Sequence, residues 1–128
     1  MCRYLLVGAG GFAGAIARYA IAVWIGSLWR KPFPLGTFVI NISGCFILGA
    51  FLAFAAERAS IDETWRLLIA TGFLSAYTTF STFEYETVVL ARGGAVGWAM
   101  LNVAASVIVG YLAVRVGTVA AFTLRSWP

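Results

Sequence analysis

The chain has 128 residues, of which 62% are hydrophobic and only 11% are charged, and it contains no histidine. A soluble domain carries roughly 25% charged residues, so this composition excludes a soluble globule and predicts an all-α integral membrane protein. The missing histidine excludes a histidine-based catalytic or metal site, and a net charge of +4 spread over several loops does not indicate a nucleic-acid-binding surface. We expect neither an enzyme nor a nucleic-acid-binding protein.

A helix that crosses the hydrocarbon core of a bilayer needs about 20 apolar residues. The chain has four apolar runs of this kind with short polar connections, so we expect a single transmembrane domain over residues 1–128. Asp62, just before the third run, is placed to act as a helix N-cap. The predicted spans cover about 4–28, 36–56, 64–91 and 95–124.

The Lys and Arg residues of short loops set the orientation of a membrane protein. Four of them lie on the side of the N-terminus and three on the other side. They are Arg3, Arg58, Arg66 and Arg125 on the first side, and Arg30, Lys31 and Arg92 on the second. Four against three is almost no bias, so we predict that the chain inserts in both directions and forms an antiparallel, dual-topology homodimer in the lipid bilayer.

The first span contains a glycine-rich stretch from Gly8 to Gly14 that is similar to a dinucleotide-binding fingerprint. That fingerprint requires an acidic residue about 20 positions later, and the chain has none before Glu57. Gly10 and Gly14 instead form a small-residue surface that lets another helix approach closely. Arg18, a cation within the span, either snorkels or holds backbone carbonyls, or it lines an aqueous vestibule that attracts anions.

Polar side chains also occur in the second and fourth spans. Asn41 lies in the first half of the second span, with Thr37 one turn earlier on the same face. Such groups face a partner or water rather than lipid, so they serve either an interhelical hydrogen bond or a polar pathway. In the fourth span Asn102, Ser106 and Gly110 lie one turn apart on one face, which is either a polar track or a packing seam.

The third span has seven hydroxyl-bearing side chains in the thirteen residues from Thr71 to Phe83. Serine and threonine compete for backbone hydrogen bonds and lower the helix propensity, so we predict a break in this helix. Non-helical backbone at membrane depth must be covered by protein or water, and its carbonyl groups bind cations. Phe80 and Phe83 share a helix face, where they either pack or present positive ring edges to an anion.

Together these features resemble one family. The matching motifs are Gly11-Phe12-Ala13-Gly14-Ala15 with Arg18-Tyr19, Gly36-Thr37 with Asn41 and Gly44, Thr71-Gly72-Phe73, and Thr78-Thr79-Phe80-Ser81-Thr82-Phe83. On these motifs the chain resembles the CrcB/Fluc fluoride channels over all four spans. The resemblance implies a dual-topology homodimer in the cell (inner) membrane, with two anion pores and one central structural sodium ion, that exports fluoride passively and confers fluoride resistance.

The resemblance also implies roles for single residues. The predicted fluoride pore, with the nearby hydroxyl groups included, comprises Asn41, Phe80, Phe83, Ser106, Thr37 and Thr82. Arg18 is implied at the vestibule, and the sodium ion at the backbone carbonyls of Ser75 and Thr78. The family usually has a glycine pair where this chain has Ser75-Ala76, so a break with a positive φ at this pair would be strained.

Two other functional classes fit a four-span membrane protein. A small dual-topology exporter of the multidrug type needs a carboxylate within the membrane. Here Glu57 ends the second span, and Glu84 and Glu86 follow the predicted break towards the membrane surface. A subunit with no transport activity of its own would not require the hydroxyl-rich break. Efflux of fluoride relative to chloride from liposomes distinguishes these classes.

Overall fold

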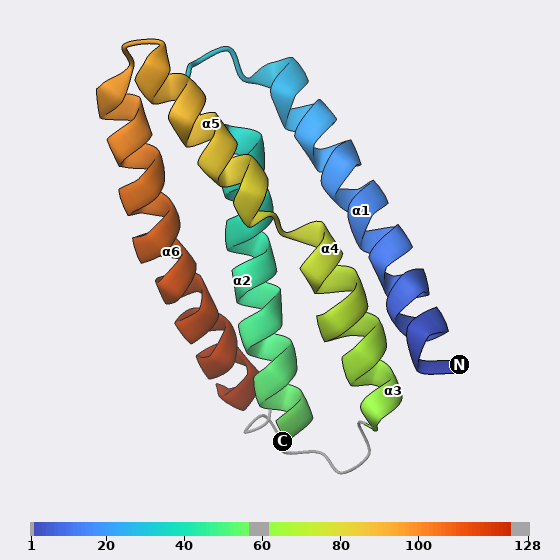
Figure 1. The fold of residues 1–128 in the computed structure, drawn as a ribbon. Helices are drawn as coiled ribbons and strands as arrows, with labels where there is room; N and C mark the ends of the chain where they lie inside the picture. The colour runs from blue at the N-terminus through green and yellow to red at the C-terminus, as the bar shows by residue number, and fades with distance from the viewer. Residues whose placement is uncertain (1, 57–61, 124–128) are drawn as a thin grey trace.

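The structure is a computed structural model that describes residues 2–56 and 62–123. Every regular element in these two ranges is helical, and the long helices run up and down in an elongated bundle (Figure 1). In chain order they are α1 (Cys2–Leu28), α2 (Leu35–Ala56), α3 (Glu63–Trp65), the π-helix η1 (Arg66–Leu74), α4 (Ser75–Tyr77), α5 (Phe80–Arg92) and α6 (Val96–Thr123). Some residues used in the sequence predictions lie outside the described ranges, namely Glu57, Arg58, Leu124 and Arg125.

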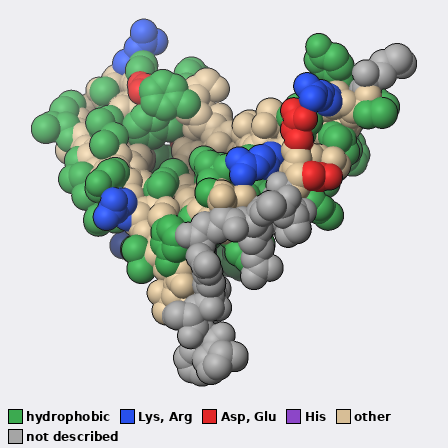
Figure 2. Space-filling view, turned by 90° about the horizontal axis from the view of Figure 1, so that it is seen from below, with side chains coloured by type: hydrophobic (Ala, Val, Ile, Leu, Met, Phe, Trp, Pro, Cys, Tyr) green, Lys and Arg blue, Asp and Glu red, His purple; other side chains and the backbone are tan. Residues whose placement is uncertain are grey.

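Three helices, α1, α2 and α6, are long and apolar enough to cross a membrane. They begin and end within two residues of the first, second and fourth predicted spans. Many of their large apolar side chains are exposed, among them Phe12, Trp24 and Val107. Figure 2 shows hydrophobic side chains on both lobes of the molecule and an open hollow between the lobes. Such an outer surface suits contact with lipid rather than with water.

The third predicted span is divided into shorter pieces. The elements α3, η1 and α4 follow one another without a gap, but Thr78 (φ −80°, ψ 160°) and Thr79 (φ −152°, ψ 117°) have extended backbone before α5 begins at Phe80. Ser75 is in the right-handed helical region, and no non-glycine residue within the described ranges has a positive φ. The interruption therefore lies at Thr78-Thr79, and the Ser75-Ala76 pair takes ordinary helical backbone that needs no glycine.

Glycines let pairs of helices approach backbone to backbone. A Cβ atom at Gly10 would lie 2.1 Å from the carbonyl oxygen of Leu68, and one at Gly14 would lie 2.2 Å from that of Phe73, both in η1. The small-residue surface of the first span is therefore used within the chain, where it seats α1 on η1. The same close approach joins α2 to α6, because a Cβ atom at Gly117 would lie 2.1 Å from the carbonyl oxygen of Phe46.

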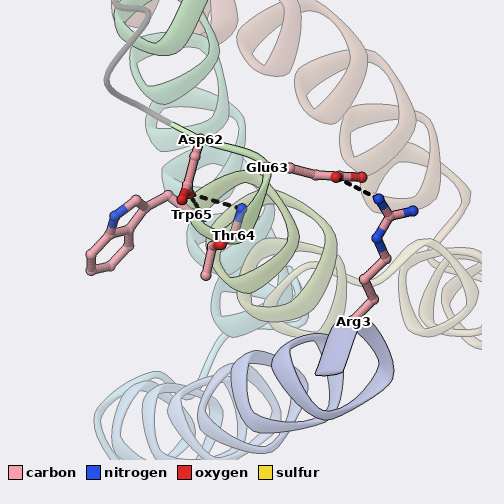
Figure 3. Close-up of polar contacts among 5 residues, drawn as sticks. All are labelled: Arg3, Asp62, Glu63, Thr64 and Trp65. Atoms are coloured by element: carbon pink, nitrogen blue, oxygen red, sulfur yellow. Dashed lines mark hydrogen bonds and ion pairs between the residues drawn. The ribbon is translucent and has the colours of Figure 1, made fainter. Parts of the chain in front are cut away.

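Polar contacts fix the start of the third segment against α1 (Figure 3). Asp62 caps α3 as predicted, since its Oδ1 accepts hydrogen bonds from the backbone N–H groups of Thr64 at 3.0 Å and Trp65 at 3.4 Å. Glu63 forms an ion pair with Arg3 of α1 at 2.7 Å. Both of these side chains are largely exposed, so the ion pair adds little stability, but it joins the N-terminal ends of α1 and α3.

Candidate functional site

A cavity of about 380 Å³, called the groove below, lies at the interruption between α4 and α5. Its walls come from α2, η1, α4, α5 and α6. Six of the nine predicted site residues line it: Asn41, Ser75, Thr78, Phe80, Phe83 and Ser106. The other three, Thr37, Thr82 and Arg18, do not. The structure therefore brings most of the predicted site together from three separate spans.

Asn41 is bonded to the interrupted backbone. Its Oδ1 accepts a hydrogen bond from the Thr79 N–H at 2.8 Å, and its Nδ2 donates to the Thr79 carbonyl at 3.0 Å. The side-chain amide therefore replaces the helical acceptor that the Thr79 N–H loses where the helix stops, and it adds a second donor to the Thr79 carbonyl at the N-cap of α5. Backbone groups at membrane depth must have partners, so the extended conformation of Thr79 depends on this amide. The Nδ2 atom carries two protons, and this pairing uses one of them.

Because of these contacts, two carbonyl groups lack the N–H donors that they would have in a continuous α-helix. In a continuous α-helix each carbonyl accepts from the N–H four residues later, which for Ser75 and Thr78 means the N–H groups of Thr79 and Thr82. Here the Thr79 N–H donates to Asn41 and the Thr82 N–H donates to Thr79 Oγ1 at 3.3 Å. The carbonyl oxygens of Ser75 and Thr78 are thereby released from the α-helical hydrogen-bond pattern. Carbonyl groups at such breaks can coordinate cations.

Thr79 and Thr82 form a hydroxyl pair at the start of α5. The Thr79 Oγ1 acts as the N-cap of α5, where it accepts from the Thr82 N–H, and it donates to the Thr82 Oγ1 at 2.9 Å. Because the Thr82 hydroxyl accepts in this pair, its own proton is not used there. Thr79 lines the groove, whereas Thr82 does not.

Phe80 and Phe83 lie side by side, with ring centroids 5.7 Å apart and ring planes inclined by 43°. Phe83 is buried, with 7% of its surface exposed, whereas Phe80 is 73% exposed. Other residues of the same chain therefore surround the Phe83 ring, whereas the Phe80 ring is open to a partner. On α6, Ser106 Oγ is buried and has no hydrogen-bond partner among the described residues. The groove thus combines two aromatic rings, an amide and a hydroxyl whose proton is not committed elsewhere.

The other predicted residues lie away from the groove. Thr37 lines a second cavity of about 390 Å³ between α1, α2 and α5, where its hydroxyl donates to Glu86 Oε1 at 3.0 Å. Glu86 Oε2 is buried and has no hydrogen-bond partner in the described part of the chain. Arg18 on α1 is partly exposed and lines neither cavity. Within the described ranges it forms no ion pair.

Sequence reasoning missed several members of this region. It assigned no role to Glu86, although a carboxylate within a predicted span was the available signal. It also missed the contact between Tyr77 OH and Ser43 Oγ at 2.8 Å, which joins α4 to α2 beside the groove. Gly44, the next residue of α2, leaves room for the Thr78 side chain, which a Cβ atom at this position would meet. The only sequence signal for Ser43 was a hydroxyl in an apolar span.

Comparison with known proteins gives a family. A family model described as "CrcB-like protein, Camphor Resistance (CrcB)" matches residues 5–118 of the chain. The chain belongs to the CrcB family. A protein of Acidobacterium capsulatum named "Fluoride-specific ion channel FluC" is 48% identical over 117 residues, which is 91% of this chain and 94% of that protein.

Two further relatives carry the same name. The protein of Solibacter usitatus is 43% identical over 93% of this chain and 98% of its own length, and that of Koribacter versatilis is 46% identical over 81% and 82%. These CrcB relatives are thus named as ion channels and not as enzymes. With three helices long and apolar enough to cross a bilayer, this CrcB chain is a multi-pass membrane protein.

Proposed function

We propose that the chain is a subunit of a fluoride-selective ion channel that exports fluoride passively across the cell membrane, which is the inner membrane in a cell with two. Such export lowers the fluoride concentration inside the cell. The names of the relatives support fluoride as the ion. The observation that carries the proposal is the groove, because Asn41, Phe80, Phe83 and Ser106 come from three different helices and line one cavity.

The groove offers what a dehydrated anion needs. An ion in a narrow passage loses part of its water shell, and the protein must supply replacements. The ring edges of Phe80 and Phe83 carry positive potential, and one proton of Asn41 Nδ2 and the proton of Ser106 Oγ are not used by the hydrogen bonds described above. All these groups are neutral. They therefore bind an anion without holding it as tightly as a fixed positive charge would.

Arg18 and Thr37 belong to the ends of the proposed pathway. The Arg18 guanidinium has no ion-pair partner in the described part of the chain, so its positive potential is available to concentrate anions at a vestibule. Thr37 lines the second cavity, one helical turn before Asn41. Its hydroxyl donates to Glu86 in that cavity rather than to a group of the groove, which supports a position outside the narrow part of the proposed pathway. We assign both residues to entry or exit of the ion.

The second part of the proposal is an antiparallel, dual-topology homodimer. The nearly even distribution of loop charges supports it. In the single chain the Phe80 ring is 73% exposed beside the groove, and the hollow between the lobes in Figure 2 is open to a second copy. A copy inserted in the opposite direction would cover Phe80 and repeat the groove, which gives two pathways in each dimer.

A structural sodium ion at the centre of the dimer is the third part. The carbonyl oxygens of Ser75 and Thr78 line the interruption, and the N–H groups four residues later are bonded elsewhere. Released carbonyls at membrane depth are costly, and a monovalent cation satisfies them without any charged side chain. Two copies would supply four such oxygens. The ion would hold the two interruptions together and would not be transported.

Efflux from liposomes tests the proposed function. The purified chain is reconstituted alone in liposomes loaded with fluoride or with chloride. An ionophore then removes the membrane potential that opposes anion efflux, and an ion-selective electrode measures the ion released. We expect fast fluoride efflux and little chloride efflux. Equal efflux of both ions, or none above protein-free liposomes, would contradict the proposal.

The orientation is tested separately in cells. A tag at the C-terminus should be accessible on both sides of the inner membrane, in comparable amounts. A tag found on one side in nearly all molecules would exclude dual topology, whatever the liposome assay shows. Lysines added to the first loop should then give a chain that functions only together with a copy biased in the opposite direction.

A further inference from the structure

Asn102 is the most deeply buried polar residue among those described, with 1% of its surface exposed. It lies on α6, one turn before Ser106, but it is not part of the groove lining. A buried side-chain amide without hydrogen bonds is strongly unfavourable in a membrane protein. Its contacts therefore indicate what the residue does.

The amide of Asn102 begins a chain of two directed hydrogen bonds. Its Nδ2 donates to Thr87 Oγ1 at 2.8 Å, and the Thr87 hydroxyl donates its single proton to the Phe83 carbonyl at 2.8 Å. The Thr87 hydroxyl thus accepts from α6 and donates within α5. A threonine hydroxyl that bonds the carbonyl four residues earlier bends a helix locally. Because Asn102 donates to the Thr87 hydroxyl, it fixes the Thr87 conformation that bonds the Phe83 carbonyl.

The short helix α5 is attached at two points on either side of the Phe83 ring. At its start, Asn41 of α2 pairs with both backbone groups of Thr79. One turn after Phe83, Asn102 of α6 holds Thr87. The position of α5 along α6 sets where the Phe83 ring lies relative to Ser106, since both line the groove.

We infer that Asn102 is a positioning residue for Phe83, which acts through Thr87 to fix α5 on α6 and so to set the aromatic ring in the anion pathway. This inference rests on the proposed function, because the ring matters only if an anion passes it. It predicts that Asn102 and Thr87 act as one unit. A residue that contacted the anion directly would act independently of Thr87.

The test compares five variants of the full-length protein in liposomes, four single substitutions and the double variant Asn102→Leu/Thr87→Val. Asn102→Leu keeps the size of the side chain and removes the amide, while Thr87→Val keeps the shape and removes the hydroxyl. Thr87→Ser keeps the hydroxyl and serves as the rescue. Thr118→Val is the matched control, because Thr118 also bonds the carbonyl four residues earlier, that of Val114, at 2.9 Å, but contacts α2 rather than α5.

Two measurements are made on each variant. The first is fluoride efflux as a function of the internal fluoride concentration, which separates maximal flux from half-saturation. The second is the ¹⁹F resonance of 4-fluorophenylalanine at position 83, which reports the surroundings of the ring without any transport. We expect Asn102→Leu and Thr87→Val each to move the resonance and to lower the maximal flux about tenfold. The double variant should be no worse than either single one.

Thr87→Ser should restore both measurements, and Thr118→Val should leave both as in the wild type. An unmoved resonance in Thr87→Val, or losses in the double variant that multiply those of the single ones, would overturn the inference. If Asn102→Leu does not fold, the two Thr87 variants still test the inference. Thr87→Val removes the hydroxyl through which Asn102 acts, and Thr87→Ser shows whether that hydroxyl accounts for the change. If the wild type exports no fluoride, the proposed function fails, and the resonance still decides whether Asn102 positions the ring.

Discussion

The substitutions Asn41→Leu and Asn41→Asp together test the structural role of the groove amide and its proposed anion-binding role. Leucine has nearly the size of asparagine and can neither donate nor accept a hydrogen bond. It removes both contacts to Thr79, at 2.8 Å and 3.0 Å, while the rest of the groove lining is unchanged. The Thr79 N–H would then be without a partner next to the interruption, whereas the Thr79 carbonyl, at the N-cap of α5, keeps the first hydrogen bond of that helix.

The size of the effect follows mainly from the Thr79 N–H. A buried backbone donor that loses its partner costs roughly 1–3 kcal/mol, and the carbonyl loses a second hydrogen bond worth about 1 kcal/mol, so the substitution destabilises the fold by about 2–4 kcal/mol. The control Ser43→Ala, two residues later on α2, removes one hydroxyl contact to Tyr77 and should cost about 1 kcal/mol. Asn41→Asp keeps the acceptor for the Thr79 N–H and loses the donor, so its stability should be intermediate.

The free energy of unfolding is measured by denaturant titration in mixed micelles, and hydrogen exchange is measured over residues 75–83. We expect Asn41→Leu to lose stability and to exchange faster at the interruption, and Ser43→Ala to show a small change in both. Asn41→Asp should abolish fluoride efflux despite its intermediate stability, because a fixed negative charge in a dry passage repels the ion. Wild-type stability and exchange in Asn41→Leu would refute the view that this amide holds the interruption open.

Three further predictions concern the rings, the packing and the cation. Phe80→Ile and Phe83→Ile should each strongly reduce fluoride efflux while the dimer stays intact, because an aliphatic side chain keeps the bulk of the ring but has no positive edge. Unchanged efflux in both variants would show that the rings only pack. Gly117→Ala should prevent stable folding, as its Cβ atom would meet backbone at 2.1 Å, whereas Gly97→Ala, with nothing within 4 Å, should not destabilise the protein in a melting experiment. Replacement of sodium by a large organic cation should lower fluoride efflux and dimerisation. Ser75→Gly should be tolerated, whereas Ser75→Pro should not. Efflux and dimerisation that do not change when sodium is removed would count against the cation site.

Much of this architecture follows from local sequence. Long apolar runs fix the positions of α1, α2 and α6, because a bilayer core demands a set length of apolar helix. The crowding of hydroxyl groups between Thr71 and Phe83 indicates where the third span is weak, and the extended residues Thr78 and Thr79 lie in that stretch. Six of the site residues that the family resemblance implied line the groove.

The partners of the polar groups did not follow from the sequence. Asn41 bonds Thr79, which is 38 positions away, and Thr37 bonds Glu86, which is 49 positions away. Such pairs depend on how two helices are rotated and shifted against each other, and spacing within one helix carries no information on that. The comparison with a glycine pair directed attention to Ser75-Ala76, whereas the chain avoids a positive φ by extending Thr78 and Thr79 instead.

Asn41 and Asn102 play similar structural roles at the interruption. Each comes from a long, continuous helix, α2 or α6, and each bonds the short helix α5 or the residue before it. An interruption at membrane depth frees backbone groups that lipid cannot satisfy, so it can exist only where neighbouring helices supply polar side chains. Those side chains necessarily lie beside the freed backbone, which is where an ion can also exchange its water for protein groups. The groups that stabilise the interruption and the groups available to an ion are therefore neighbours for the same physical reason, and Asn41 belongs to both sets.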